Sequence, residues 1–277
     1  TRTAREQAVQ VAAAQQQVYL RLERYAAKLS DALIMVCESN RQEAIAAGLA
    51  PAEKISTIYS GIEFGRFQQP VDRAAKCREL GLAPDRPIVG MIGRLSAQKA
   101  PLDFVAAAKL ALERRPEAQF ILVGDGPQAG EVAEAVAGEP RIRVLGYRDD
   151  VPELCGILDV FALASLWEGL GRALTEAMIM AVPVAATAVN GIPELVIHRE
   201  TGLLSAPGQP AGLGENIAWL LAHPAEAQAM SRRGQARVLP KFGAAQMVEQ
   251  IEALYERLLA EKARDQLALD LTHSPSH

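Results

Sequence analysis

The sequence predicts an α/β fold: a doubly wound parallel sheet with helices on both faces. Short apolar runs such as "PIVGMIG", "AQFILVG" and "LDVFALA" alternate with segments of helical character. Continuous apolar runs of this length are typical of strands buried on both faces, and their alternation with helices is typical of parallel sheets. Because right-handed crossovers place all the strand ends on one edge, the polar turns that follow these runs should gather there.

The first sixty residues predict two helices and two short strands. Residues 4–28 form the first helix, which ends in the amphipathic segment "VYLRLERYAAKL". The apolar runs in "DALIMVCES" and "KISTIYSG" are the strand candidates. Between them, "SNRQEAIAAG" predicts a helix with Ser39 as its N-cap and Gly48 as its stop.

After a segment with the character of a linker, residues 62–87, the alternation becomes regular. Helices are predicted from Pro101 to about Arg114, after Pro127, in "VPELCGI" and from Gly171. Pro101 suits the start of its helix because proline is tolerated in the first helical turn. "IRVLG", "PVAAT" and "TGLLS" complete the strand candidates. From Pro210 onward the pattern is helical, with breaks at Pro224 and Pro240.

The composition excludes several classes of protein. A net charge of -4 and an aromatic content of 5% argue against a nucleic-acid partner, which needs a basic face or a stacking platform. Three cysteines, far apart and without a CxxC pair, argue against a disulfide framework or a zinc site. No apolar run reaches the length of a membrane span, and the N-terminus lacks a signal-peptide core. We therefore expect a cytoplasmic protein.

The turns after the strands carry the charged residues that are candidates for ligand binding or catalysis. Arg94 and Lys99 follow "PIVGMIG", and "GDGP" follows "AQFILVG". The stretch "SLWEGLGR" puts Glu168 in a turn, and Glu176 lies on the helix that starts at Gly171. Cations and the free N–H groups of a helix start attract phosphate, while carboxylates accept hydrogen bonds from sugar hydroxyls. The edge therefore predicts a site for a sugar joined to a diphosphate.

At these residues the sequence resembles a known family. "E168-GLGRALT-E176" is similar to the Glu-x7-Glu motif of retaining GT-B nucleotide-sugar glycosyltransferases, the glycosyl transferases group 1 family. "GRLSAQKAPLDFVAAA", "FILVGDGP", "LGYRDDVPEL", "AVNGIPELV" and "TGLLS" resemble that family's successive blocks, in order. The resemblance covers about residues 55–225.

The resemblance implies a role for each matching residue. Arg94 and Lys99 would hold the donor diphosphate, Glu176 the donor ribose and Glu168 the transferred sugar. Arg94, Lys99 and Glu168 are the predicted catalytic residues. The remaining predicted donor-binding residues supply backbone contacts to the base, the sugar or the phosphate, and they are Gly93, Gly124, Gly146, Tyr147, Arg148, Gly169, Leu170 and Gly171.

The sequence departs from the family pattern in two places. Only the end of the first of the family's two Rossmann-like domains is recognisable, in residues 1–60. Residues 61–240 would be the nucleotide-sugar-binding domain, 241–262 a C-terminal helix and 263–277 a disordered tail. The incomplete N-terminal segment should expose strand edges and apolar faces, so we expect it to dock, to self-associate, to contact the inner membrane peripherally or to be mobile. The second departure is Ala100, where a glycine is common.

Three functions remain open. The first is a metal-independent hexosyltransferase that uses a UDP-, GDP- or ADP-sugar, no cofactor, and a sugar, lipid or polysaccharide acceptor, with retention of anomeric configuration. The absence of an Asp-x-Asp pair favours cations over a metal at the diphosphate. The second is a nucleotide-sugar-binding half without activity, either a pseudoenzyme or a subunit of a split enzyme. The third is a nucleotide-sugar epimerase of the same architecture. A dinucleotide oxidoreductase is disfavoured because Gly-Arg-Leu-Ser, not GxGxxG, follows "PIVGMIG".

Simpler interpretations stand beside these. Glu168 and Glu176 would also suit a solvated helix start, where the helix dipole favours carboxylates. Arg94 and Lys99 would also suit a charged surface, and "GDGP" an ordinary turn. Trp167 is expected to pack against the sheet edge.

Overall fold

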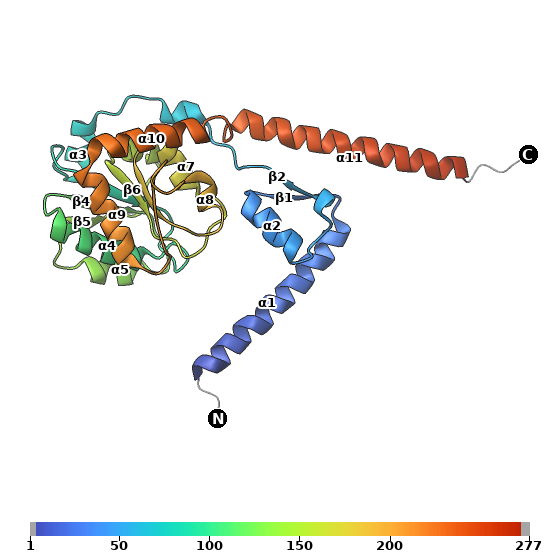
Figure 1. The fold of residues 1–277 in the computed structure, drawn as a ribbon, viewed down its shortest axis with the longest axis horizontal. Helices are drawn as coiled ribbons and strands as arrows, with labels where there is room; N and C mark the ends of the chain where they lie inside the picture. Colours follow the sequence, from blue (N-terminus) through green and yellow to red (C-terminus); the bar gives the residue numbers. More distant parts are fainter. Residues whose placement is uncertain (1–3, 273–277) are drawn as a thin grey trace, which may run out of the picture. The chain divides into compact units, whose positions relative to one another are not determined.

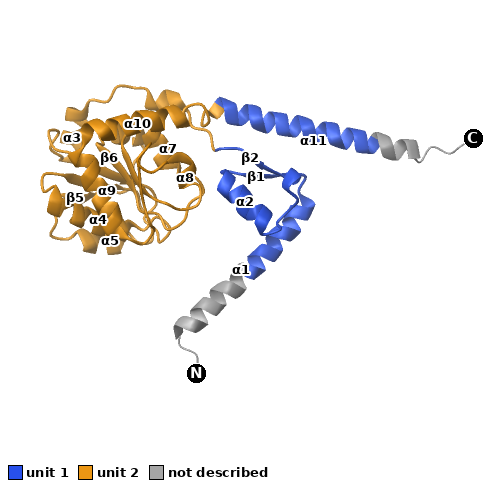
Figure 2. Ribbon diagram, viewed as in Figure 1, with its two compact units in different colours: residues 1–59, 245–277 blue, residues 60–244 orange. Residues whose placement is uncertain are grey.

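A computed structural model describes residues 4–272, with side chains from residue 17 to residue 266. The chain divides into two compact units (Figure 2). Unit 1 consists of residues 1–59 and 245–277, and unit 2 of residues 60–244.

Unit 1 contains a small parallel sheet and three helices (Figure 1). Strand β1 pairs in parallel with β2, with Leu33 opposite Ile55. The exposed fraction of Ile34 on β1 is 45%, and that of Val36 directly after the strand is 37%, so this apolar segment is partly uncovered. The elements of this unit are α1 (Ala4–Leu29), β1 (Leu33–Met35), α2 (Glu38–Ala46), the 3-10 helix η1 (Ala52–Lys54), β2 (Ile55–Thr57) and α11 (Ala244–Thr272).

Two boundaries in unit 1 differ from the prediction. Helix α2 begins at Glu38 with Cys37 as its N-cap, so the assignment of Ser39 was wrong. The Glu38 carboxylate accepts a hydrogen bond of 2.8 Å from the Thr57 hydroxyl, which anchors the first turn to β2. Residues 263–272 continue helix α11, although a tail was predicted there, because the segment contains several alanine and leucine residues, which favour helix. Residues 273–277 lie outside the described part of the chain.

Unit 2 is built on a six-stranded sheet in the order β5-β4-β3-β6-β7-β8, and every pairing is parallel. The chain starts in the middle at β3, winds outward to β5, and then returns to place β6 on the other side of β3. The strand order therefore reverses between β3 and β6. The strands are β3 (Ile88–Ile92), β4 (Gln119–Val123), β5 (Ile142–Val144), β6 (Val160–Leu163), β7 (Val184–Thr187) and β8 (Leu203–Ser205).

Two groups of helices cover this sheet (Figure 1). Helices α4 and α9 pack against each other, and α5 lies beside α4. Helix α7 packs against α10 and α6, and α3 joins α6. The helices of unit 2 are α3 (Arg73–Leu80), α4 (Pro101–Arg114), α5 (Ala129–Val136), α6 (Val151–Gly156), α7 (Arg172–Ile179), α8 (Ile192–Leu195), α9 (Pro210–Ala222) and α10 (Pro224–Val238).

The segment predicted as a linker, residues 62–87, is structured. It contains a 3-10 helix η2 (Phe64–Phe67) and helix α3. The Asp72 carboxylate caps α3 by accepting a hydrogen bond of 2.9 Å from the Ala75 amide, and Gly81 ends the helix in the left-handed conformation. Buried Cys77 fixes one face of α3. The helix was missed because its eight residues carry little apolar periodicity.

The core of unit 2 follows from the predicted strands. All residues of β3, β4, β6 and β7 are buried, as expected for central strands of a parallel sheet. Phe104 on α4 meets Phe120 on β4 edge to face, with ring centroids 6.1 Å apart. This packing holds α4 against the sheet and fixes where the loop before α4 begins.

The ends of β3 and β4 touch at two glycines. A Cβ atom on Gly124 would lie 2.0 Å from the carbonyl oxygen of Gly93, and the φ of Gly124 is +137°. Only glycine satisfies both the close approach and this backbone conformation. The first glycine of "GDGP" therefore serves the junction of two strands.

Substituting Gly124 tests this junction. We expect Gly124→Ala to lower the free energy of unfolding by about 3 kcal/mol, because the added methyl group collides with backbone rather than with a flexible side chain. Gly130→Ala is the matched control, since Gly130 lies on helix α5 with open space around its Cα. It should raise the free energy of unfolding by about 0.5–1 kcal/mol. Urea denaturation measures both; equal stabilities for the two variants would contradict the assignment.

Candidate active site

A cavity of about 790 Å³ lies at the edge where the predicted site residues gather. It collects residues from the turn after β3, the loop after β5 and the start of α7. In an open α/β sheet, ligands bind in the crevice where the strand order reverses, and the turns after β3 and β6 flank that point. The polar groups and glycine that line it include Arg66, Gly93, Lys99, Tyr147, Arg148, Arg172 and Glu176.

A buried ion pair joins the two sides of the crevice. The Lys99 ammonium, from the turn after β3, contacts the carboxylate of Glu168, from the turn after β6. Only 5% of the Glu168 side chain is exposed. Its Oε1 also accepts a hydrogen bond of 2.7 Å from the Ser165 hydroxyl, and its backbone N–H donates to Asn190 Oδ1 over 3.1 Å. Lys99 and Ser165 therefore hold the carboxylate, and Asn190 holds the backbone beside it; a buried charge requires such partners.

Helix α7 presents the second carboxylate. Gly171 precedes the helix with a φ of +78°, and an added Cβ would lie 2.9 Å from Ile192, so the turn needs glycine. Glu176 lies a little more than one turn into α7, is 8% exposed and lines the cavity. Arg172 Nε donates to Glu176 Oε1 over 2.9 Å. The Arg172 side chain is 65% exposed, so this pairing can open at little cost.

The loop after β5 brings backbone to the cavity. Gly146 has a φ of +69° and open space where a side chain would start, and Tyr147 beside it is 75% exposed. Arg148 lines the cavity, but its guanidinium is engaged elsewhere: it donates two hydrogen bonds, of 2.8 and 2.6 Å, to the Asp150 carboxylate. It also pairs with Glu79 on α3. The side chain of Arg148 therefore stabilises the loop.

Seven of the predicted site residues are not among the residues that line the cavity: Arg94, Gly124, Gly146, Glu168, Gly169, Leu170 and Gly171. Arg94 is exposed and forms no ion pair with a described residue. Gly124 faces Gly93, as described above, and Leu170 is buried with 7% exposure. The Gly169 carbonyl oxygen accepts a hydrogen bond of 3.1 Å from the Gly191 amide, which links the turns after β6 and β7. Trp167, which was predicted to pack against the sheet edge, is 52% exposed.

Ala100, the residue that departs from the family pattern, has a φ of +46° at the start of α4. This left-handed conformation favours glycine, which explains why glycine is common there. Alanine is accommodated with 7% exposure.

Other site residues were missed from the sequence. Ser165 and Asn190 hold Glu168, and both follow predicted strands, so their positions in the turns were a usable signal. Arg66 and Phe67 line the cavity from η2, within the supposed linker. No local pattern marks them, because only the tertiary fold brings η2 to this edge. Across the described residues, no group of three or more His, Cys, Asp and Glu side chains is arranged to hold a metal ion.

Comparison with known proteins decides the family. Residues 86–223 match the family described as Glycosyl transferases group 1. An alpha-maltose-1-phosphate synthase of Mycobacterium tuberculosis (strain CDC 1551 / Oshkosh) is 31% identical over 265 residues, which are 88% of this chain and 67% of the relative. The chain belongs to the glycosyl transferases group 1 family.

Two further similar proteins agree with this assignment. The UDP-Gal:alpha-D-GlcNAc-diphosphoundecaprenol alpha-1,3-galactosyltransferase of Escherichia coli is 33% identical over 194 residues, 68% of this chain and 50% of that protein. The structure of Anabaena Alr3699/HepE in complex with UDP and glucose superposes with a TM-score of 0.80 at 27% identity, over 87% of this chain and 67% of that chain. The GT-B resemblance and the predicted fold class are thereby confirmed.

The chain spans about half to two thirds of the length of the curated relatives that it matches. None of the described helices is both long and apolar enough to cross a bilayer.

The ion-pair network around Arg148 predicts a dependence of stability on pH. Arg148 holds the pKa of the Asp150 carboxyl well below its usual range, and Lys76 adds a hydrogen bond of 2.7 Å. A depressed pKa stabilises the fold above the unfolded-state pKa, near 4 for aspartate, and this stabilisation is lost as the pH falls toward the folded-state value. We expect Asp150→Asn to lower the free energy of unfolding at pH 7 by about 1–3 kcal/mol.

The penalty of Asp150→Asn should shrink between pH 4 and pH 3, because Asp150 of the unfolded wild-type chain takes up a proton there while folded Asp150 stays ionised, so the wild type itself loses stability. Urea titrations at pH 7, 5, 4 and 3 measure it. Glu113→Gln is the control, because Glu113 is exposed and forms no ion pair with a described residue. A penalty of the same size at every pH would contradict the charge-based account.

Proposed function

We propose that this chain contains the donor site of a metal-independent glycosyltransferase that moves a hexose from a nucleotide-diphosphate sugar to an acceptor hydroxyl with retention of configuration. The observation that carries the proposal is that Lys99 and Glu176 line one cavity at the reversal point of the sheet, with Glu168 paired to Lys99 beside it. A cation for phosphate and two carboxylates for sugar hydroxyls thus meet where such folds bind ligands.

Lys99 and Arg94 would bind the donor diphosphate. Lys99 is held in the cavity, and 19% of its side chain remains exposed. Arg94 directly follows Gly93, which lines the cavity, and its exposed guanidinium can turn toward a bound diphosphate. Negative charge grows on the leaving diphosphate as the bond to the anomeric carbon breaks. Prepositioned cations that bind this charge more strongly in the transition state lower the barrier.

The two carboxylates would orient the two sugars of the donor. Among the residues that the structure describes, Glu176 pairs with exposed Arg172 alone, and it can exchange that partner for the hydroxyls of the ribose. Glu168 is fixed by Ser165 and Lys99, so it can hold a hydroxyl of the transferred hexose close to the diphosphate. The open backbone at Gly146, next to Tyr147, would receive the base.

The names of similar proteins support the donor and acceptor classes. The Anabaena structures contain UDP, UDP-glucose, or UDP with glucose, and the Escherichia coli relative is named for a UDP-galactose donor and a lipid diphosphate acceptor. We propose a UDP-, GDP- or ADP-sugar as donor and a sugar, lipid or polysaccharide as acceptor. The proposed catalytic residues are Arg94, Lys99 and Glu168.

Loss of either cation should weaken nucleotide binding. We expect Lys99→Ala and Arg94→Ala to raise the Kd for UDP, GDP or ADP by about 10- to 100-fold, the usual effect of removing a hydrogen bond between charged groups. Isothermal titration calorimetry measures it. Arg232→Ala is the matched control, because Arg232 is exposed on α10 and lines neither this cavity nor the other one described below. Unchanged affinity in the Lys99 variant would refute the donor-site assignment.

Turnover separates transfer from binding alone. A radiolabelled nucleotide sugar incubated with the chain and an acceptor that carries a free hydroxyl should yield free nucleotide diphosphate and the glycoside of that acceptor, with the same anomeric configuration as the donor. Glu168→Gln should lower that rate by about 10²–10³, if Glu168 acts mainly in the transition state. Binding without turnover would indicate a nucleotide-sugar-binding half, and an isomerised nucleotide sugar would indicate an epimerase.

A further inference from the structure

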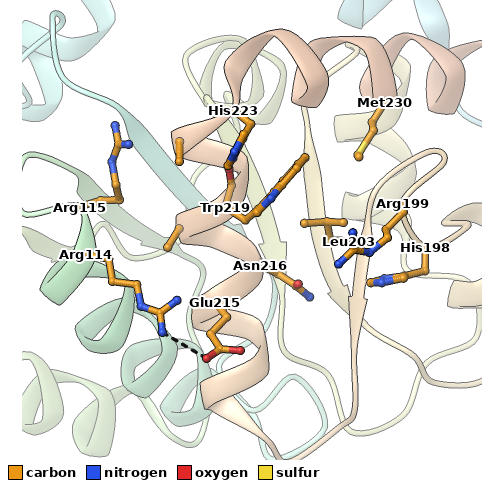
Figure 3. A pocket seen from close by; sticks show the side chains of 12 residues that line it. Arg114, Arg115, His198, Arg199, Leu203, Glu215, Asn216, Trp219, His223 and Met230 are labelled. Atoms are coloured by element: carbon orange, nitrogen blue, oxygen red, sulfur yellow. Dashed lines mark hydrogen bonds and ion pairs between the residues drawn. The ribbon is translucent and has the colours of Figure 1, made fainter.

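A second cavity, of about 740 Å³, lies in unit 2 away from the proposed donor site (Figure 3). It is formed by the C-terminal end of α4, the turn before β8, helix α9 and Met230 of α10. Among the described residues, none lines both cavities. Lys99 precedes α4 and Arg114 ends it, and the 14 residues of this helix span about 21 Å. The two cavities therefore lie at opposite ends of α4.

The second cavity is basic. Arg114, Arg115 and Arg199 line it, and Glu215 is the one carboxylate among its lining residues. Arg114 contacts Glu215 over 3.3 Å, but both side chains are more than 60% exposed, so water screens this pair strongly. Arg199 forms no ion pair with a described residue. Arg115 is paired over 2.8 Å with Glu117, which lies outside the lining, so Arg199 is the lining charge that is most available to an anion.

Arg199 also has an uncommon backbone conformation. Its φ is +64°, in the left-handed region that favours glycine. The turn is held by the hydrogen bond of 2.8 Å from the Arg199 amide to the Gly202 carbonyl oxygen. An arginine in this conformation is strained where glycine would not be, and strained positions cluster at functional sites. Its charged side chain projects beside His198 (Figure 3).

His198 supplies a neutral donor. Its Nδ1 accepts a hydrogen bond of 3.0 Å from the Leu204 amide. The proton of the neutral ring therefore sits on Nε2, which can donate to a phosphate oxygen.

An aromatic pair forms the wall between the basic groups. The rings of Trp219 and His223 stack with centroids 4.3 Å apart and planes 15° from parallel (Figure 3). The His223 ring is held by a contact of 2.9 Å from Nδ1 to the Trp219 carbonyl oxygen. Trp219 packs against the core of unit 2, so its ring is rigid. A fixed indole offers an apolar surface to a flat face of a ligand.

We propose that this cavity binds a phosphorylated sugar. Arg199 and His198, which lie side by side (Figure 3), would hold the phosphate through a charged and a neutral N–H donor. The apolar face of the sugar ring would pack on Trp219. Asn216 and Glu215 line the same cavity, and their amide and carboxylate can bind ring hydroxyls. These hydroxyl partners favour a sugar phosphate over a planar base with a phosphate. This proposal does not depend on the chemistry at the donor site.

The two tryptophans of the chain make the test direct. In a Trp167→Phe background, Trp219 is the remaining tryptophan, so indole fluorescence reports on this cavity. We expect glucose 6-phosphate to change this fluorescence saturably, with a Kd at least tenfold lower than that of inorganic phosphate. Arg199→Gly in the same background should raise the Kd at least tenfold. This variant relieves the left-handed strain, so a loss of binding cannot be ascribed to unfolding, and a thermal melt confirms it.

Controls and competing ligands decide the outcome. Arg232→Gln removes an exposed arginine from outside the cavity and should leave the Kd unchanged. If Arg232→Gln raised the Kd as much as Arg199→Gly does, the effect would be one of net charge, and the proposal would be overturned. Saturating UDP should leave the signal in place, and displacement by UDP would assign the probe to the donor cavity instead. UMP binding tighter than glucose 6-phosphate at Trp219 would overturn the sugar assignment. Absence of any saturable change would overturn the site.

Discussion

The reversal of strand order between β3 and β6 is the constraint on which the proposed site depends. On one side of this point the chain winds from β3 to β5, and on the other from β6 to β8. The turn after β3 and the turn after β6 thus leave the same edge in opposite directions and open a crevice between them. Arg94 and Lys99 come from the first turn, and Glu168 from the second. Residues about seventy positions apart become neighbours because of this winding.

Charge in the crevice is balanced by a small number of specific contacts. Glu168 is a nearly buried carboxylate, and such a group is tolerated only when it is paired and hydrogen-bonded. Lys99 and Ser165 meet that requirement while leaving part of the lysine exposed. Arg148, by contrast, is bound by Asp150 and Glu79 and serves the loop after β5. Lys99 and Arg148 are two of the four cationic side chains in the lining, and they differ: Lys99 keeps an exposed fraction that a ligand could contact, whereas Arg148 stabilises the loop.

Most of the fold was predictable because buried elements require apolar residues at regular positions in the sequence. Strands buried on both faces require apolar runs, and "PIVGMIG" and "AQFILVG" locate β3 and β4 within a residue or two. Helix α4 matches its predicted span because Pro101 marks its start. Helix α3 was missed because it is short, charged and held by Asp72 and Gly81 rather than by periodic apolar residues. The end of α11 was misjudged because helix propensity alone extends it beyond its amphipathic segment.

The site was predictable only as far as it depends on strand ends. Every turn after a strand must reach the same edge, so the convergence of Lys99 and Glu176 followed from the alternation itself. Which side of a turn a residue faces depends on contacts with other strands. Gly124 turns toward Gly93 because β3 and β4 converge there, and Leu170 turns into the core. The motif predicts that both residues lie beside the ligand. In the structure, Gly124 packs against the backbone of Gly93, and the Leu170 side chain is buried. A motif therefore fixes which loops meet, and the packing between those loops decides which atoms remain for a ligand.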